Sequence, residues 1–455
     1  MEYDNESQKW NIEAFLKALT ESESVVFSAD ITNEEAMILQ SLKEQQGKRL
    51  ICPEAKEYQD FIKAYSSSSG YHIFKGDMDT LSTSDVIISF GVWFQDERAG
   101  SIDSVQKAVE EKTIKFVYMH PIEDAALQSS VTQFIKYEVG SEEGVAALLA
   151  YAFLENKELP HEIEECLEEL DIGYLSAECN VGEEELESMH ELFDEEMTVS
   201  LVVGSDLYAH PKAAQIAKLL ALLERYADVN VVCLPPAENA LGIALICELD
   251  EMDEERSTVY QSGKEGTYLN ANRCICIHDR TQSHESEGLN ALAKSSGIDV
   301  QSLEDYSGYL PAEQGFQSLS QEDFNKPCMY KLLPQERNKS FVLDEIDDLP
   351  VYDGALIYTY PLEKPDLAED QTTEVLRASK QFALATKLQD GDLITYEISG
   401  DIFRRVFKID THMKGVIALN PICHKNLSAH LVSSYRFSRL AFEKINNQNI
   451  GNNDE

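Results

Sequence analysis

One strand–helix–strand unit, Ser200–Asp250, constrains the fold of this chain more than any other feature of the sequence. The apolar run Leu201–Val203 ends at Gly204, and a polar turn then leads to Pro211. Proline suits the first position of a helix, and the residues after it have the spacing of an amphipathic helix. A second apolar run, Val229–Leu234, follows that helix. Parallel sheets that bind cofactors at their strand ends are assembled from such units, so we predict an α/β protein.

The N-terminal part of the chain repeats the alternation of apolar runs and helical patterns. A helix is predicted over Thr32–Gln45, because Thr32 and Glu35 have the spacing of a capping box. Runs that are nearly continuously apolar indicate strands of a parallel sheet that is covered on both faces. Five runs fit this description: Ser24–Phe27, Lys48–Cys52, Asp85–Gly91, Ile114–Met119 and Phe134–Val139.

The composition changes twice further along the chain. Residues 155–196 hold seventeen acidic residues and a single lysine, Lys157, which predicts an exposed helical connector. A stretch rich in Pro, Asp, Glu and Gln, Glu313–Pro365, is expected to wrap the surface. After it, the short runs Gln381–Thr386, Leu393–Ile398, Ile402–Ile409 and Val416–Leu419 predict a small β-barrel. We therefore expect a first α/β domain at 1–150, a connector and second α/β domain at 151–340, and a linker and barrel at 341–455.

The charge of the chain limits its partners. With 82 acidic and 38 basic residues, the formal net charge is −44, which argues against nucleic acid or an anionic membrane surface as a partner. The chain has no apolar run of the roughly 20 residues that span a bilayer, and its acidic N-terminus is unlike a secretory signal. Nine irregularly spaced cysteines fit a reducing compartment. These observations predict a cytoplasmic protein.

Glycine at the junction of a strand and a helix lets the backbone approach a phosphate group. Gly91 and Gly204 both hold such places, but neither belongs to a dinucleotide-binding or P-loop pattern. A tight turn is the simpler interpretation of each. His210, beside Pro211, could serve as a general base, but we expect an exposed residue near a helix start. No nucleophile elbow and no selective pair of carboxylates is present, so we predict no catalytic residue.

Cys274, Cys276 and His278 alternate along one run and would share one face of a strand. Zinc sites usually draw four ligands from paired motifs such as Cys-x-x-Cys, and this chain has no such motif. Ile275 and Ile277 make the other face apolar too, which favours a buried central strand. We therefore predict no metal ligand and no iron–sulfur cluster in this chain.

Several segments, taken in order, resemble the large G-type subunit of bacterial NADH:quinone oxidoreductase (respiratory complex I), which is related in structure to the molybdopterin oxidoreductases. The resemblance covers roughly Val25–Leu419. The matching segments are Thr32–Glu35, Ser84–Gly91, Gly204–Leu207 with His210-Pro211, Asn239–Gly242, and Gly266–Tyr268 with Asn270 and Arg273.

The resemblance implies two interlocked Rossmann-like parallel-sheet domains and a small six-stranded barrel at about Ser379–Ile445. It also implies that vestiges of a cofactor site lie at Gly91, Gly204, Asp206, Gly266 and Asn270. The family's N-terminal domains with their cluster cysteines have no counterpart here, and Asn272 replaces a glycine expected before Arg273. These departures argue against retained pterin binding.

The resemblance therefore predicts a non-catalytic accessory subunit of the peripheral arm of complex I. Such a subunit would have no redox centre of its own, and it would be held at the membrane only through the complex. Its partners would be other complex I subunits, which would carry the iron–sulfur clusters. Two alternatives stay open: an active molybdopterin-dependent oxidoreductase fragment, and a free-standing small-molecule binding protein with a doubly wound fold. Fold class alone does not separate them.

Overall fold

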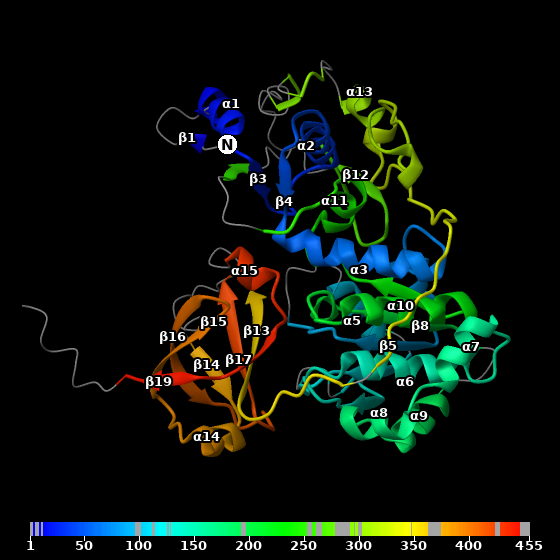
Figure 1. Ribbon diagram of the computed structural model, residues 1–455, viewed down its shortest axis with the longest axis vertical. Coiled ribbons are helices and arrows are strands. Elements are labelled where there is room, and N and C mark those ends of the chain that lie inside the picture. The colour runs from blue at the N-terminus through cyan, green and yellow to red at the C-terminus, as the bar shows by residue number, and fades with distance from the viewer. Residues whose placement is uncertain are drawn as a thin grey trace, which may run out of the picture.

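The structure is a computed structural model, and Figure 1 shows it as two α/β lobes beside a curled β half-barrel. It describes residues 3–4, 9–10, 12–95, 102–111, 114–124, 127, 129–192, 197–252, 257–260, 266–277, 292–294, 296–298, 303–346, 348–362, 375–423 and 428–445. The mixed α/β class with parallel sheets is confirmed.

A five-stranded parallel sheet forms the centre of the larger α/β lobe. Its order is β7-β6-β5-β8-β9, and every pair of neighbours runs parallel. The strands are β5 (Val86–Phe90), β6 (Lys115–Met119), β7 (Gln133–Ile135), β8 (Val199–Val203) and β9 (Asn230–Cys233). All residues of β5 and β8 are buried, as expected for central strands with continuous apolar sequence. The chain leaves β5 toward β6 on one side and β8 toward β9 on the other, so the strand order reverses between β5 and β8.

Helices cover both faces of this sheet. Helix α10 (Ala213–Tyr226), the helix of the strand–helix–strand unit, packs against α3 (Pro53–Ser69) and α6 (Glu142–Leu154). The other helices of this lobe are α4 (Met78–Thr83) and α5 (Ile102–Glu111). The acidic connector forms three short helices, as predicted for an exposed helical segment: α7 (His161–Glu168), α8 (Ile172–Cys179) and α9 (Glu183–His190).

The smaller lobe contains a three-stranded parallel sheet of order β10-β3-β4. Its strands are β3 (Ser24–Phe27), β4 (Arg49–Ile51) and β10 (Ser257–Tyr260). The capping box predicted at Thr32 and Glu35 is present at the start of α2 (Asn33–Gln46). The remaining elements of this region are α1 (Ile12–Glu21), α11 (Ala240–Ile246), α13 (Leu303–Ser307), and the two-stranded β1 (Tyr3–Asp4) and β2 (Lys9–Trp10).

The buried central strand predicted around Cys274 is wrong. Strand β12 (Ile275–Ile277) forms an antiparallel hairpin with β11 (Thr267–Leu269) and belongs to neither α/β sheet. A β-turn over Asn270–Arg273 connects the two strands, with the Arg273 N–H donating to the Asn270 carbonyl at 2.8 Å. An apolar run of this length does not by itself distinguish a central strand from a hairpin.

The half-barrel has seven strands in the order β18-β13-β17-β14-β16-β15-β19. They are β13 (Leu356–Leu362), β14 (Val375–Ala378), β15 (Leu393–Ile398), β16 (Asp401–Ile409), β17 (Ile417–Cys423), β18 (Phe437–Arg439) and β19 (Phe442–Lys444), with a short helix α15 (Ala429–Val432). The barrel therefore begins at Leu356 and not near Ser379. The predicted strand Gln381–Thr386 is instead helix α14 (Lys380–Thr386), because the Ser379 hydroxyl caps it by accepting from the Phe382 N–H at 3.1 Å.

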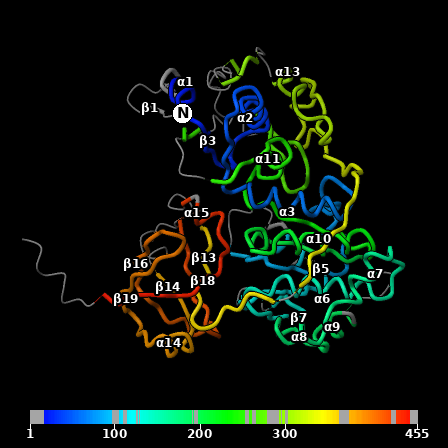
Figure 2. The backbone as a smooth tube through the Cα atoms, viewed as in Figure 1, coloured from blue at the N-terminus to red at the C-terminus, as the bar shows by residue number. Residues whose placement is uncertain are grey.

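Strands from both sides of residue 150 pair within each α/β sheet, since β3 lies beside β10 and β5 beside β8. The division of the chain at residues 150 and 340 stays a prediction. Over residues 308–346 and 348–355 the chain runs along the outside of both lobes with little regular structure, as the yellow-green tube in Figure 2 shows. This path includes two 3₁₀ turns, Ala312–Gln314 and Asp323–Asn325.

Candidate functional site

Two of the predicted cofactor-facing glycines meet at the point where the strand order reverses. Gly91 follows β5 and Gly204 follows β8, which is where parallel sheets of this type usually bind ligands. Here the crevice is closed by the backbone itself. The Gly204 N–H donates to the Phe90 carbonyl at 2.9 Å, and the Asp206 N–H donates to the Gly91 carbonyl at 3.3 Å. A Cβ at Gly204 would lie 1.9 Å from the Gly91 oxygen, so glycine is required there for backbone packing.

The carboxylate of Asp206 is the centre of a buried polar network above this crevice. Its side chain is 1% exposed, and it accepts from His120 Nε2 at 3.0 Å and from the Tyr358 hydroxyl at 2.9 Å. Arg436 Nη1 lies 3.2 Å from Asp206 Oδ1, and Arg436 Nη2 donates to the Ser205 hydroxyl at 2.6 Å. His120 follows β6, whereas Tyr358 and Arg436 belong to the half-barrel. The network therefore joins the half-barrel to the carboxyl edge of the sheet.

A second cluster also joins a histidine, a carboxylate and a half-barrel tyrosine. His210 Nε2 is 3.2 Å from Glu142 Oε2, and the hydroxyl of Tyr435, another half-barrel residue, donates to Glu142 Oε1 at 2.5 Å. Burial and the Glu142 charge raise the pKa of the Tyr435 hydroxyl well above its usual value, so it stays a donor. In both clusters the histidine Nδ1 accepts a backbone N–H two residues ahead, from Ile122 and Lys212 respectively, at 3.0 Å.

This arrangement corrects the prediction for His210. The side chain is not an exposed residue at a helix start, because it is 3% exposed and both of its ring nitrogens are engaged. With Nδ1 accepting, Nε2 carries the proton and donates to the Gly140 carbonyl at 3.3 Å, and Glu142 Oε2 lies 3.2 Å from the same nitrogen. Neither histidine therefore has a free nitrogen with which to take a proton from a substrate.

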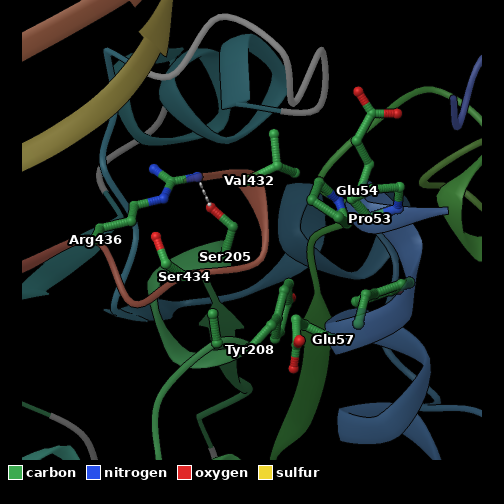
Figure 3. Close-up of a pocket in the computed structure, with 11 residues that line it drawn as sticks. Pro53, Glu54, Glu57, Ser205, Tyr208, Val432, Ser434 and Arg436 are labelled. Atoms are coloured by element: carbon green, nitrogen blue, oxygen red, sulfur yellow. Dashed lines mark hydrogen bonds between the residues drawn. The ribbon is translucent and has the colours of Figure 1, made fainter. Parts of the chain in front are cut away.

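The space left at the carboxyl edges of the two sheets is small and acidic. Figure 3 shows the pocket between the start of α3, the loop after β8 and the segment 432–436, and its cavity volume is about 30 Å³. That volume holds water only. A larger groove of about 270 Å³ adjoins it. Its charged lining comprises Lys56, Glu57, Asp250, Glu251 and His430.

Carboxylates dominate the electrostatics of both cavities. Burial and the nearby charges of Glu251 and Asp60 raise the pKa of Glu57, which lines both, to about 7. Lys56 is already paired with Glu251 at 2.9 Å and with Asp60. A pterin cofactor brings anionic phosphate groups, which require volume and available cationic or N–H donors. Arg436, the cation of the smaller pocket, is engaged by Asp206, so these residues do not fit a molybdopterin.

The other two predicted positions lie at the β11–β12 hairpin of the smaller lobe. Gly266 has φ +150°, and a Cβ there would lie 2.3 Å from a Glu34 carboxylate oxygen. The Asn270 side chain accepts the N–H groups of Asn272 and Cys274 at 3.0 and 2.9 Å and so shapes the hairpin turn. The structure thus brings Gly91, Gly204 and Asp206 together, while Gly266 packs closely on the start of α2 and Asn270 shapes a local turn.

The buried carboxyl of Glu34 is expected to make the stability of the protein depend on pH. It is fully buried, and although Thr267 donates to it from N and Oγ1 at 2.7 and 2.8 Å, burial dominates and raises its pKa from 4.5 to about 7. A folded-state pKa above the unfolded value means that the folded state binds more protons between these pH values. Stability is therefore lost as pH rises from about 4.5 to 7, by roughly 3 kcal/mol from this group alone. Denaturant midpoints measured across this range should fall less steeply for Glu34→Gln than for the unchanged protein, and parallel profiles would contradict this assignment.

The alternating Cys274, Cys276 and His278 are not described as a set of free side chains. Cys274 is bonded to Cys328 in a disulfide, so it has no thiolate to offer a metal, and His278 lies outside the described residues. Among the described residues, no group of three or more His, Cys, Asp or Glu side chains has a metal-binding arrangement. No helix within those same ranges is long and apolar enough to cross a membrane.

Similarity to known proteins identifies the fold of this chain but not its function. No family model matches the chain, and no curated protein matches its sequence. Among solved structures, it is similar to acetylene hydratase from Pelobacter acetylenicus, with a TM-score of 0.59 and 10% sequence identity, over 93% of this chain and 84% of that one. The fold is of the molybdopterin-enzyme type. At this identity the likeness shows the fold alone.

The expectation of a complex I subunit is wrong. The similarity found is to a molybdopterin-type enzyme structure, and it gives no support to a G-type subunit, a respiratory chain or a membrane association. It agrees better with the alternative of an oxidoreductase-like fragment. The matching segments are short, and close contacts within this chain account for Gly204 and Gly266.

Proposed function

We propose that this chain is a non-catalytic scaffold built on the fold of the molybdopterin enzymes. The observation that carries the proposal is the closed crevice between β5 and β8. Gly204 packs directly on the Gly91 carbonyl, and the Asp206 network holds the half-barrel over the place where a ligand would enter. The fold would thus be kept for its shape and its outer surfaces.

The acidic helices offer the surface that such a scaffold would present. Fourteen carboxylates are exposed over residues 155–191, and within the part of the chain that the structure describes none of them has an ion-pair partner. A partner protein with a basic surface would gain from this field, which would also speed association at low salt. We therefore propose a protein with a basic surface as the partner.

A second candidate is an oxidoreductase-like fragment that binds a molybdopterin. The similarity to acetylene hydratase favours it, because that likeness extends over 93% of this chain. The small acidic cavities and the engaged Arg436 weigh against it.

Metal and pterin content separates the two candidates. The full chain is produced in a host that makes the molybdenum cofactor, purified without chelators, and assayed for molybdenum, tungsten and oxidised pterin. The scaffold predicts less than about a tenth of an equivalent of each per chain. One equivalent of either metal together with pterin would overturn the scaffold and establish the second candidate.

A further inference from the structure

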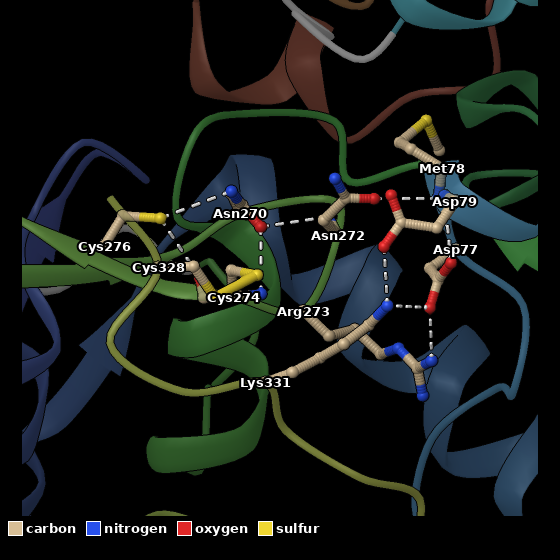
Figure 4. Close-up of a disulfide and its surroundings, with 10 residues drawn as sticks. All are labelled: Asp77, Met78, Asp79, Asn270, Asn272, Arg273, Cys274, Cys276, Cys328 and Lys331. Atoms are coloured by element: carbon tan, nitrogen blue, oxygen red, sulfur yellow. Dashed lines mark hydrogen bonds and ion pairs between the residues drawn. A yellow bond between two sulfur atoms is a disulfide. The ribbon is translucent and has the colours of Figure 1, made fainter. Parts of the chain in front are cut away.

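The disulfide between Cys274 and Cys328 joins the β11–β12 hairpin to the chain that crosses both lobes (Figure 4). Cys274 precedes β12, and Cys328 lies 54 residues further along, with 5.4 Å between the two Cα atoms. Both cysteines are half-buried, and Lys326 and Pro327 beside Cys328 are exposed. A soluble dithiol can therefore reach this bond.

The segment that follows Cys328, which we call the strap (residues 328–343), continues as an added strand against β12. The Met329 N–H donates to the Ile275 carbonyl at 2.8 Å, and the Ile275 N–H donates to the Tyr330 carbonyl at 2.9 Å. The Leu332 N–H donates to the Arg273 carbonyl at 2.7 Å. The disulfide thus joins the first residue of the strap to Cys274, which lies within this short hydrogen-bonded ladder.

The strap also links the two α/β lobes. Lys331 Nζ lies 2.6 Å from Asp77 and 3.0 Å from Asp79, at the start of α4, and Arg273 Nη2 lies 2.8 Å from Asp77. Further along, the strap is fixed independently of the disulfide. The Arg337 N–H donates to the Gly70 carbonyl and the Ser340 N–H donates to the Ser67 carbonyl, each at 2.8 Å. Opening the disulfide would therefore loosen the first part of the strap, which then depends on the ladder and on the Lys331 ion pairs, and would leave the second part fixed.

The remaining thiols do not share these features. Five of the seven free cysteines are buried, and the two half-buried ones, Cys166 and Cys423, have no disulfide partner. Burial raises the pKa of the Cys276 thiol, two residues from Cys274, and so keeps it in the unreactive thiol form at neutral pH. Cys274 and Cys328 are thus set apart by both accessibility and pairing.

We propose that Cys274 and Cys328 form a reversible thiol–disulfide modification site that sets whether residues 328–332 stay bound along β12. In the reducing direction, a protein dithiol of the thioredoxin type attacks one sulfur and forms a mixed disulfide, and its second thiol then resolves it. The S–S bond of this chain breaks, two electrons and two protons pass to the cysteines, and the reductant becomes a disulfide. A disulfide oxidant reverses the exchange.

Thiol counting on the full chain tests whether the bond forms. Protein purified in air without reductant is denatured and alkylated, and its mass is measured. Seven alkylated cysteines are expected, since seven are free and two are bonded. Nine alkylated cysteines would overturn the proposal. Titration of the folded protein with dithiothreitol should then yield nine, and a bond that resists reduction until the protein unfolds would mark it as purely structural.

Hydrogen exchange tests the consequence for the strap. In the reduced protein, the amides of residues 329–332 should exchange at least tenfold faster than in the oxidised protein, whereas amides of residues 337–343 should change by less than twofold. Cys328→Ser should behave like the reduced protein, and Cys166→Ser should behave like the oxidised one. Chemical reduction of the unchanged chain keeps the test valid if Cys328→Ser fails to fold. Equal exchange rates at 329–332 in both states would overturn the proposal.

Discussion

Replacing Asp206 by alanine is expected to destabilise the contact between the half-barrel and the larger lobe by about 3–5 kcal/mol. The carboxylate accepts from His120, Tyr358 and Arg436, and its side chain is 1% exposed. Its removal leaves the Arg436 guanidinium, whose side chain is 11% exposed, without the charge that compensates it. An uncompensated buried charge is costly because the interior does not replace the water it has lost.

Thermal and denaturant unfolding of the full chain measure this effect. The control is Asp353→Ala, since Asp353 is an exposed carboxylate on the chain leading into β13. It should change the unfolding midpoint only within experimental error. If Asp206→Ala unfolds like this control, the network does not hold the half-barrel in place.

Gly204→Ala is expected to destabilise the protein by about 3 kcal/mol, at or above the upper end of ordinary overpacking. The added Cβ would lie 1.9 Å from the Gly91 oxygen and 2.6 Å from the Val92 Cα, and both atoms belong to the backbone of the neighbouring strand end. A flexible side chain could move aside, but these atoms cannot move without separating β5 from β8.

The matched control is Gly173→Ala, in the exposed helix α8, where a Cβ would come no closer than 3.5 Å to another residue. This control should leave stability unchanged or raise it by about 0.5–1 kcal/mol, because alanine is the better helix former. Equal unfolding midpoints for the two variants would show that the crevice between β5 and β8 is open.

Local patterns predicted much of the fold. The unit that begins at Leu201 became β8, α10 and β9, because its apolar runs and its amphipathic spacing agreed. The capping box at Thr32 is confirmed, because such a motif depends only on two residues that lie three positions apart in the sequence. Errors arose where short runs are ambiguous. The run at Gln381 follows a capping serine and forms a helix, and the run at Cys274 forms a hairpin.

The polar clusters of the candidate site could not be predicted in this way. Asp206 meets His120 across 86 residues of sequence and Tyr358 across 152 residues, and no periodic pattern encodes such pairings. One signal was available, because a His-Pro pair follows the strand region at both His120 and His210. The second histidine was instead predicted to be exposed. The disulfide between Cys274 and Cys328 was missed because scattered cysteines do not reveal their connectivity.

Native mass spectrometry of the full chain from a host that makes the molybdenum cofactor tests the central claim most directly. If the chain's own groups close the crevice between β5 and β8, the folded protein has the mass of the polypeptide alone, 51.2 kDa. Gentle and harsh ionisation should give the same mass, and molybdenum should be absent. A folded species that is heavier by the mass of a pterin cofactor and a metal would contradict the claim, if harsh ionisation removes that extra mass.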